Sequence, residues 1–229
     1  MYKRQILDYH GIYKPAGLQR TYPNVVNFEG VHGLEQMKWS EESVDQVTYD
    51  VTMPFIRMNA GPVDYTQGAM LNAAKGHFVP RRSEPMSQGT RCRQLAEYVV
   101  FHAPLSMLCD SPSNYDREPE CTSFICGVPT VWDRTVAIDG RLGEYVVVAR
   151  RKDDVWYVGG LTGHEGRTVT LELGFLGDGN FTAEIFRDGA NAARYGHDYQ
   201  REIRSLGTAR ALEIKMAPAG GFALRITRD

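Results

Sequence analysis

The feature that most constrains the fold is a change of pattern near residue 130. From residue 131 onward, apolar and polar residues alternate in short runs, and this period of two is typical of half-buried β-strands. Turn-forming pairs such as Asp139-Gly140, Asp153-Asp154 and Asp188-Gly189 separate the runs. The pattern predicts an antiparallel β-sandwich over residues 131–229. The seven runs cover residues 134–140, 143–153, 154–162, 167–177, 180–189, 211–216 and 220–227.

Residues 1–130 carry a different pattern, in which apolar runs end in polar residues. Three such runs span residues 6–10, 51–65 and 104–110, and the polar residues that close them are His10, Asp64 and Asp110. Polar residues at the C-terminal ends of parallel strands are where barrels and open sheets place their chemistry. These three residues are therefore candidates for a functional site.

A helix is expected over residues 88–102, between the second and third runs. Its apolar residues follow the i, i+3, i+4, i+7, i+8 spacing of an amphipathic helix, and Pro104 stops the pattern. Ser87 and Thr90 are the candidate N-caps. The apolar positions are Cys92, Leu95, Ala96, Val99 and Val100.

Strands that alternate with a helix predict a parallel sheet for the first part of the chain. A (β/α)8 barrel takes about 250 residues, and only about 130 precede the alternating runs. We therefore expect an α/β plus all-β chain: the second half of a (β/α)8 barrel over residues 1–130, then an antiparallel C-terminal β-sandwich domain over residues 131–229. The same argument predicts a C-terminal fragment of a longer enzyme. The connection at 111–133 is expected to hold a short helix at 120–126.

Composition excludes several classes of function. The net charge of −2 over 229 residues gives no basic surface, so nucleic-acid binding is not expected. No stretch approaches 18 consecutive apolar residues, so no membrane span is expected. The N-terminus has two basic residues but then Asp8 and His10, which does not resemble a signal peptide. The four cysteines are too unevenly spaced for a disulfide framework or a zinc site, so we expect free, buried thiols.

Two glutamates, Glu29 and Glu35, lie six residues apart in the run NFEGVHGLEQMKW. Gly30 and Gly33 between them permit a tight turn that can bring the carboxylates together. Convergent carboxylates suit a hard divalent cation, which prefers oxygen ligands, or glycosidic hydrolysis, which needs a proton donor and a second carboxylate. Two solvated loop carboxylates are the alternative. The nearby aromatic residues Phe28 and Trp39 offer flat surface that can stack on a sugar.

The remaining polar candidates are ambiguous on sequence grounds. His10 and His32 fit a structural histidine as well as a functional one. Asp64 fits a turn residue or a catalytic residue, and Asp110, before Ser-Pro, fits a turn. The stretch GGLTGHEG at 159–166 lacks the Lys-Ser/Thr ending of a phosphate-binding loop and lies in the alternating region, so we reject that function.

Several long motifs together resemble glycoside hydrolase family 97. They are DYHGIYKPAGLQRTYPNVVNFEGVHGLEQMKW, PFIRMNAGPVDYTQGAM, SEPMSQGTRCRQLAEYVVF, PLSMLCDSPSNY and GVPTVWD. The resemblance extends over residues 2–229. It implies a calcium-dependent, exo-acting α-glycosidase with an N-terminal β-sandwich, a catalytic (β/α)8 barrel and a C-terminal antiparallel β-domain. This chain resembles the latter half of the barrel and the C-terminal domain.

The resemblance also implies roles for individual residues. Glu35 corresponds to the general acid and lies close enough to the calcium ion to bind it, Glu29 to a calcium ligand, and His10 to a histidine that holds substrate hydroxyls. Gly11 stands where inverting members carry a glutamate base. The glycine implies the retaining, α-galactosidase-like branch, with α-galactosidase activity favoured over α-glucosidase activity and an aspartate nucleophile on an earlier barrel strand, outside this chain.

We therefore expect a glycoside or oligosaccharide substrate, Ca2+ as cofactor, and a need for the N-terminal sandwich and the first barrel strands. Family analogy predicts a periplasmic or extracellular location. The alternatives are a non-catalytic carbohydrate-binding or structural β-sandwich module and a truncated, inactive gene product. Trp156-Tyr157 is the one aromatic platform that such a module offers, and since the two residues alternate in a strand, at most one faces outward.

Overall fold

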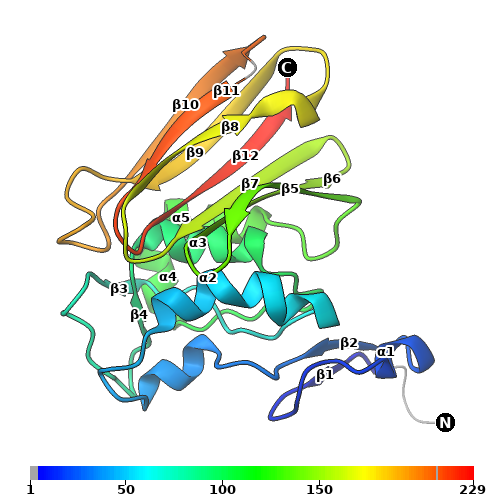
Figure 1. Ribbon diagram of the computed structural model, residues 1–229, viewed down its shortest axis with the longest axis vertical. Helices are drawn as coiled ribbons and strands as arrows, with labels where there is room; N and C mark the ends of the chain where they lie inside the picture. Colours follow the sequence, from blue (N-terminus) through cyan, green and yellow to red (C-terminus); the bar gives the residue numbers. More distant parts are fainter. Residues whose placement is uncertain (1–4, 210) are drawn as a thin grey trace.

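The computed structural model describes residues 5–209 and 211–229, and most of its regular structure is β, with a few helices. The first part begins with two parallel strands, β1 (Leu7–Tyr9) and β2 (Val25–Phe28), joined through α1 (Leu18–Thr21) (Figure 1). Beyond β2, the Asp64 amide donates to the Phe28 carbonyl over 2.9 Å, and the Val63 amide donates to the His102 carbonyl over 2.9 Å. The extended segment around residue 64 therefore lies between β2 and residue 102.

A second parallel pair, β3 (Leu71–Ala73) and β4 (Met86–Gln88), forms a separate two-stranded sheet. Within the described residues the parallel strands form two such pairs and no continuous sheet, so the half-barrel remains a prediction. The domain boundary expected between residues 130 and 131 also remains a prediction. Two short 3-10 helices, Leu34–Lys38 (η1) and Met58–Ala60 (η2), complete this part.

Helix α2 (Gln46–Ile56) corrects one expectation, because the apolar run at 51–65 begins inside a helix and not in a strand. The Asp45 carboxylate accepts a hydrogen bond from the Thr48 amide over 3.0 Å and caps the helix. The buried positions Val47, Asp50 and Val51 follow the helical period. Because Asp50 is polar, the apolar residues of the sequence alone did not show this period.

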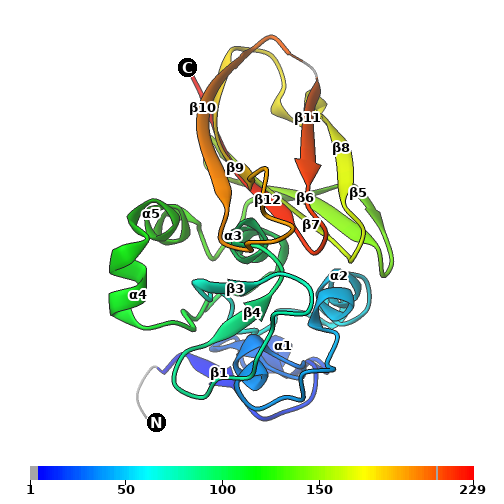
Figure 2. The ribbon, with the colours of Figure 1, turned by 90° about the vertical axis from the view of Figure 1, so that its left-hand side faces the viewer.

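Helix α3 (Arg91–Val100) confirms the helix expected at 88–102, and of the two candidate caps it is Thr90 whose hydroxyl accepts from the Arg93 amide, over 3.2 Å. Ser87 lies in β4 instead. Although the sequence of the helix is amphipathic, all ten of its residues are buried, so it has no solvent-exposed face. It lies between the six-stranded sheet and the β3–β4 pair (Figure 2). Arg150 from the sheet donates to the carbonyls of Val99 and Val100 and so satisfies the C-terminal end of α3.

Two helices, α4 (Pro112–Arg117) and α5 (Pro119–Gly127), lead into the antiparallel part, and α5 confirms the short helix expected at 120–126. One sheet has six strands in the order β10-β9-β12-β7-β6-β5, and β11 and β8 form a second. Every pairing in both sheets is antiparallel. The strands are β5 (Arg134–Arg141), β6 (Tyr145–Lys152), β7 (Val155–Thr162), β8 (Arg167–Glu172), β9 (Phe181–Asp188), β10 (Tyr199–Gly207), β11 (Ala211–Met216) and β12 (Gly221–Arg228), with a 3-10 helix, Leu173–Leu176 (η3), after β8.

All seven runs expected after residue 130 contain a strand, and among the described strands of this antiparallel part the sequence missed β10. This strand lies at the edge of the sheet, where it pairs with β9 alone. Only Leu206 in it is fully buried, while Ile203 is 68% exposed. An edge strand has few neighbours to cover its side chains, so the alternation that identifies a half-buried strand is weak there.

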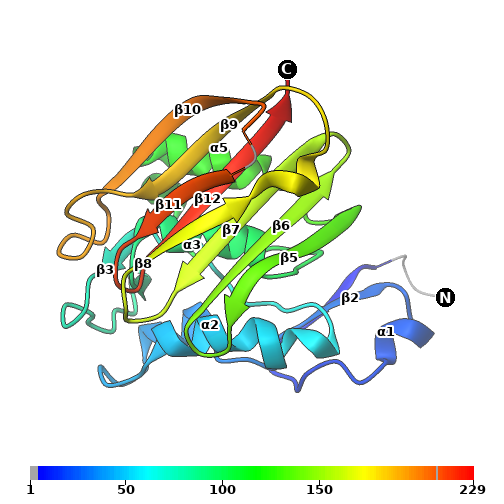
Figure 3. The same ribbon diagram turned by 45° about the horizontal axis from the view of Figure 1, so that its top comes forward.

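The described residues form three hydrophobic cores, one of which packs α2 and the β3–β4 pair, with Val51 and Ala73, against the sheet residue Leu161. The other two lie on opposite faces of the six-stranded sheet. One fills the space between that sheet and the β8–β11 pair (Figure 3), and includes Val147, Trp156 and Leu224. The other lies between the sheet and helices α3 and α5, and includes Leu95, Phe124 and Tyr157. Trp156 and Tyr157 are therefore both buried, one in each core, and they offer no exposed platform for a sugar.

The cysteines are free, as expected, although only Cys92 and Cys121 are fully buried; Cys109 is partly buried and Cys126 is exposed. Within the described residues, no helix has both the length and the apolar character needed to cross a membrane.

Candidate active site

The site forms where β1 and β2 end side by side. His10 directly follows β1 and Glu29 directly follows β2, and because the strands are parallel these two residues lie at the same edge. The Glu29 amide donates to the Tyr9 carbonyl over 2.8 Å, which extends the pairing up to the site. Glu35 lies in the first turn of η1, which follows Glu29 along the same loop.

Glycines make the loop that returns Glu35 to Glu29. Gly30 has φ of +52°, and a Cβ there would lie 2.4 Å from the Lys14 backbone nitrogen, so the turn excludes any other residue. A Cβ at Gly33 would lie 2.9 Å from the Tyr65 carbonyl oxygen. The close approach lets the Leu34 amide donate to that same carbonyl over 2.8 Å. The turn that the sequence permitted is thus present.

His10 joins three carboxylates. Its Nε2 lies 2.7 Å from Glu35 Oε1 and 3.5 Å from Glu29 Oε1, while Nδ1 lies 2.8 Å from Asp64 Oδ2. The hydrogen bond with Asp64, helped by the one with Glu35 and by the charges of both glutamates, raises the pKa of His10 to about 9. His10 is therefore an imidazolium at neutral pH, and it balances part of the negative charge of the cluster.

Glu29 is buried and fixed through one of its two oxygens. Glu29 Oε2 accepts a hydrogen bond of 2.6 Å from the Gly11 amide. Glu29 Oε1 has only long contacts, 3.4 Å to Gln36 Nε2 and 3.5 Å to His10 Nε2. Glu35 is held through its backbone, whose amide donates to Thr66 Oγ1 over 3.0 Å. Its carboxylate is about one third exposed and faces His10.

The donor set fits a hard cation. His10, Glu29 and Glu35 offer ligand atoms that all lie within 4.8 Å of one another. Calcium prefers oxygen ligands, so the two carboxylates are suitable and the imidazole is not. Glu29 Oε1, which lacks a short hydrogen bond, is the oxygen best free to bind an ion. Most of the six to eight ligands that calcium takes would come from water or from other groups.

Sequence reasoning left two contributors to this site unassigned. Asp64 is 3% exposed, and its Oδ1 has no hydrogen-bond partner among the described residues. Asp8, two residues before His10 on β1, was missed; burial, with the nearby charge of Asp64, raises its pKa to about 6. The period of two along a strand, which puts Asp8 and His10 on one face, was the available signal.

The other candidates have structural roles. Nδ1 of His32 lies 2.8 Å from Gln46 Oε1 and anchors the loop to α2. Asp110 accepts hydrogen bonds from the Met70 and Ser111 amides and forms a turn. Phe28 is buried in a stack with Tyr9 and offers no surface to a sugar, which leaves Trp39, 56% exposed, as the available aromatic ring in this loop.

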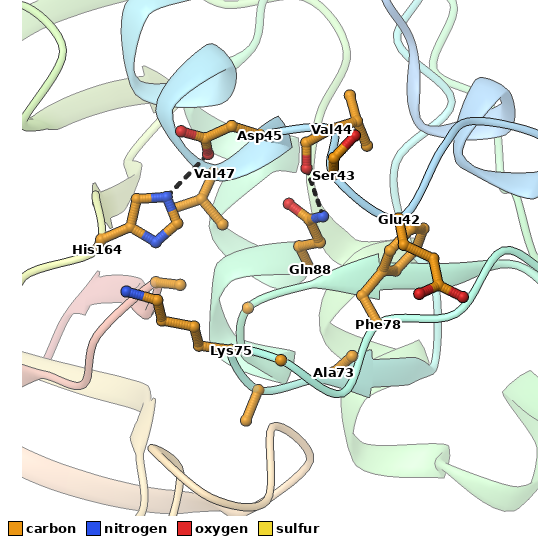
Figure 4. A pocket seen from close by; sticks show the side chains of 14 residues that line it. Glu42, Ser43, Val44, Asp45, Val47, Ala73, Lys75, Phe78, Gln88 and His164 are labelled. Carbon is orange, nitrogen blue, oxygen red and sulfur yellow. Dashed lines mark hydrogen bonds and ion pairs between the residues drawn. The ribbon is translucent and has the colours of Figure 1, made fainter.

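A separate cavity of about 360 Å³ lies among residues 42–47, 73–78 and 88–89 and the loop at His164 (Figure 4). His164 Nε2 bonds Asp45 Oδ1 over 2.8 Å at its wall, and Lys75 lies nearby. His10, Glu29 and Glu35 do not line it. The cavity is thus distinct from the carboxylate cluster.

Comparisons with known proteins agree with the resemblance in the sequence. Residues 131–227 match the family model described as "Glycosyl-hydrolase 97 C-terminal, oligomerisation". The chain is 62% identical, over 221 residues, to the "Retaining alpha-galactosidase" of Bacteroides thetaiotaomicron; the match covers 96% of this chain and 33% of that protein. It is 29% identical to a "Probable retaining alpha-galactosidase" of Streptomyces bingchenggensis, with 95% of this chain and 31% of that protein covered.

Solved structures give the same result. A glycoside hydrolase family 97 enzyme from Pseudoalteromonas sp. strain K8, in complex with acarbose, superposes with a TM-score of 0.85 and 35% identity. A beta-arabinopyranosidase superposes with a TM-score of 0.77 and 28% identity. Each match covers 96% of this chain and 34% of the solved chain. The chain therefore spans about a third of the length of its relatives; it is similar over nearly its whole length to glycoside hydrolase family 97 enzymes, and its residues 131–227 match the C-terminal model of that family.

Proposed function

We propose that this chain is the C-terminal part of a retaining, calcium-dependent, exo-acting α-glycosidase that removes terminal α-linked sugars. In this proposal, residues 1–130 form half of a (β/α)8 barrel and carry part of its active site. The names of the two curated relatives favour an α-galactosidase over an α-glucosidase. The observation that carries the proposal is the convergence of Glu35, His10 and Glu29 at the C-terminal ends of adjacent parallel strands.

Glu35 is the proposed general acid and base. Its carboxylate is part-exposed, so it is accessible to a leaving-group oxygen with which it would exchange a proton. In a retaining mechanism it first protonates the glycosidic oxygen and then deprotonates the incoming water. His10, which lies against it, would hold a substrate hydroxyl in line with that carboxylate.

Glu29 and Glu35 are the proposed calcium ligands. A bound calcium ion would supply a fixed positive charge that orients substrate hydroxyls and lowers the pKa of a nearby acid. Glu29 is suited to this role because the Gly11 amide already fixes one carboxylate oxygen and leaves the other free of short contacts.

Gly11 supports the retaining branch. It has no side chain to activate water, and it contributes its backbone N–H to Glu29 instead. A retaining enzyme needs a carboxylate nucleophile, and we propose that an aspartate outside this chain supplies it. The 229 residues alone should therefore fail to hydrolyse an aryl α-galactoside or an aryl α-glucoside. Turnover that depends on Glu35 in this isolated chain would overturn the proposal that the nucleophile lies elsewhere.

A calcium titration tests the metal site independently of turnover. Calorimetric titration of CaCl2 into the chain should give binding that Glu29→Gln abolishes. Glu41→Gln is the matched control, because Glu41 is an exposed carboxylate in the same loop region. Equal heats for the wild type and Glu29→Gln would remove Glu29 as a ligand.

We also propose that residues 131–227 take part in self-association. The description of the matching family model names oligomerisation, and β10 leaves an exposed edge with Ile203 at its surface. Analytical ultracentrifugation of wild type and Ile203→Lys tests this: the variant should sediment as a smaller species. A monomeric wild-type protein, or no difference between the two, would contradict it.

A further inference from the structure

Within the described part of the chain, Arg57 is a buried cation whose hydrogen bonds all go to backbone carbonyls. It follows α2, is 7% exposed, and forms no ion pair among the described residues. Its guanidinium lies within hydrogen-bonding distance of five carbonyl oxygens: Nε donates to Gly30 at 3.2 Å, Nη1 donates to Gly61 at 3.1 Å, and the two N–H groups of Nη2 are shared among Phe28 at 3.1 Å, Glu29 at 2.8 Å and Pro62 at 3.0 Å.

These five carbonyls belong to two separate segments. Residues 28–30 form the end of β2 and the start of the glutamate loop, and residues 61–62 lead into the segment that carries Asp64. The guanidinium therefore ties together the backbones that present Glu29 and Asp64 to His10. Guanidinium has five N–H donors in a rigid fork, whereas a lysine ammonium has three. No other side-chain type can satisfy this set.

We propose that Arg57 is a positioning residue for the Glu29 carboxylate. Burying a cation is costly unless hydrogen bonds compensate for the lost water, and here the compensation consists of the carbonyls around Glu29. By fixing those carbonyls, Arg57 holds Glu29 Oε2 against the Gly11 amide and Oε1 toward His10. The inference deepens the proposed function, because the position of Glu29 matters most if that carboxylate binds calcium.

The Gly11 amide provides a direct readout, since it donates its hydrogen bond to Glu29 Oε2 over 2.6 Å. We would measure residue-resolved amide hydrogen exchange in the metal-free chain for the wild type, Arg57→Lys and Arg57→Gln. Exchange at Gly11 should accelerate at least about tenfold in both variants. Amides inside α3 should keep their protection from exchange. The Arg57 guanidinium donates to residues 28–30 and 61–62 and not to α3.

Arg150→Lys is the matched control. Arg150 is also buried and also donates to backbone carbonyls, those of Val99 and Val100, but at the end of α3. This variant should change exchange in α3 and leave Gly11 unchanged. If Gly11 keeps wild-type protection in both Arg57 variants, the inference is wrong. If both variants lose protection in α3 as well, Arg57 is a general structural residue and the positioning role is also wrong.

Calcium titration of the same proteins separates this inference from the proposed function. Residues that orient metal ligands typically change metal affinity by 10- to 100-fold when they are mutated, so Arg57→Lys should weaken calcium binding by about tenfold while Arg150→Lys does not. A wild-type chain that binds no calcium would count against the proposed metal site, and Gly11 exchange would still decide the role of Arg57. Unchanged affinity in Arg57→Lys would contradict the inference.

Discussion

Replacing Asp188 by asparagine should remove a large part of the pH dependence of stability. Asp188 ends β9 and is 8% exposed. Its Oδ2 accepts hydrogen bonds from the Ala217 amide over 2.9 Å and the Gly221 amide over 3.1 Å, while Oδ1 has no hydrogen-bond partner among the described residues. Burial outweighs these bonds and the charge of Arg93, and it raises the pKa of Asp188 to about 6.

The magnitude follows from proton linkage. The folded-state pKa of about 6 exceeds the ordinary value of 3.8 by about two pH units, and one unit corresponds to about 1.4 kcal/mol. The folded protein therefore binds more protons than the unfolded protein between pH 4 and pH 6. Asp188 should cost about 3 kcal/mol of stability above pH 6, and this cost should disappear as the pH falls to 3.8.

The assay is urea unfolding at several pH values between 3.8 and 7.5, followed by tryptophan fluorescence. The difference in unfolding free energy between Asp188→Asn and the wild type should grow by about 3 kcal/mol from the lowest to the highest pH. Asp116→Asn, a change at an exposed aspartate, should track the wild type. A constant difference between Asp188→Asn and the wild type across this range would refute the reasoning, because it would mean that Asp188 has the same pKa in both states.

Three further outcomes follow from the packing and the site. Gly160→Ala should destabilise the chain by about 1–3 kcal/mol in thermal unfolding, since its Cβ would lie 2.2 Å from the Phe222 ring; an unchanged melting temperature would contradict the packing of β7 against β12. Arg150→Met should cost about 2–4 kcal/mol in urea unfolding because it leaves the end carbonyls of α3 without donors, and a cost under about 0.5 kcal/mol would count against that role. Calcium at about 100 times its Kd should raise the unfolding free energy by about 2.7 kcal/mol, and Glu29→Gln should abolish the rise; a rise that survives in Glu29→Gln would place the ion elsewhere.

The antiparallel part of the fold could be predicted well because β8 and β11 bury one face only, while central strands such as β7 are apolar runs buried on both faces. The runs around Val147, Val169 and Ile214 alternate since every second side chain enters the same core. The strand β10 lies at an edge, where burial no longer imposes alternation. Helix α3 was predicted from its period, but the sequence did not reveal that Arg93 and Glu97 are buried as well. Their burial depends on the sheet that packs against the helix, and that packing is a long-range property.

The carboxylate cluster could be predicted only in part. The glycines allowed Glu29 and Glu35 to converge, and the φ of +52° at Gly30 is the local feature that spacing can anticipate. Asp64 stayed ambiguous because its contact with His10 joins residues 54 positions apart. Arg57 was missed because a guanidinium that binds only carbonyls leaves no charge partner in the sequence to search for.

The most direct test of the account is the leaving-group dependence of the enzyme to which we assign this chain, with Glu35→Gln compared with the wild type and with Glu41→Gln. A general acid contributes about 10²- to 10⁴-fold to the rate. Glu35→Gln should therefore lose at least about 100-fold in kcat/KM on a phenyl α-galactoside, whose leaving group needs a proton. It should lose far less on a 2,4-dinitrophenyl α-galactoside, whose leaving group does not, and Glu41→Gln should match the wild type on both. Equal losses by Glu35→Gln on the two substrates, or no loss, would contradict the assignment of Glu35 as the general acid.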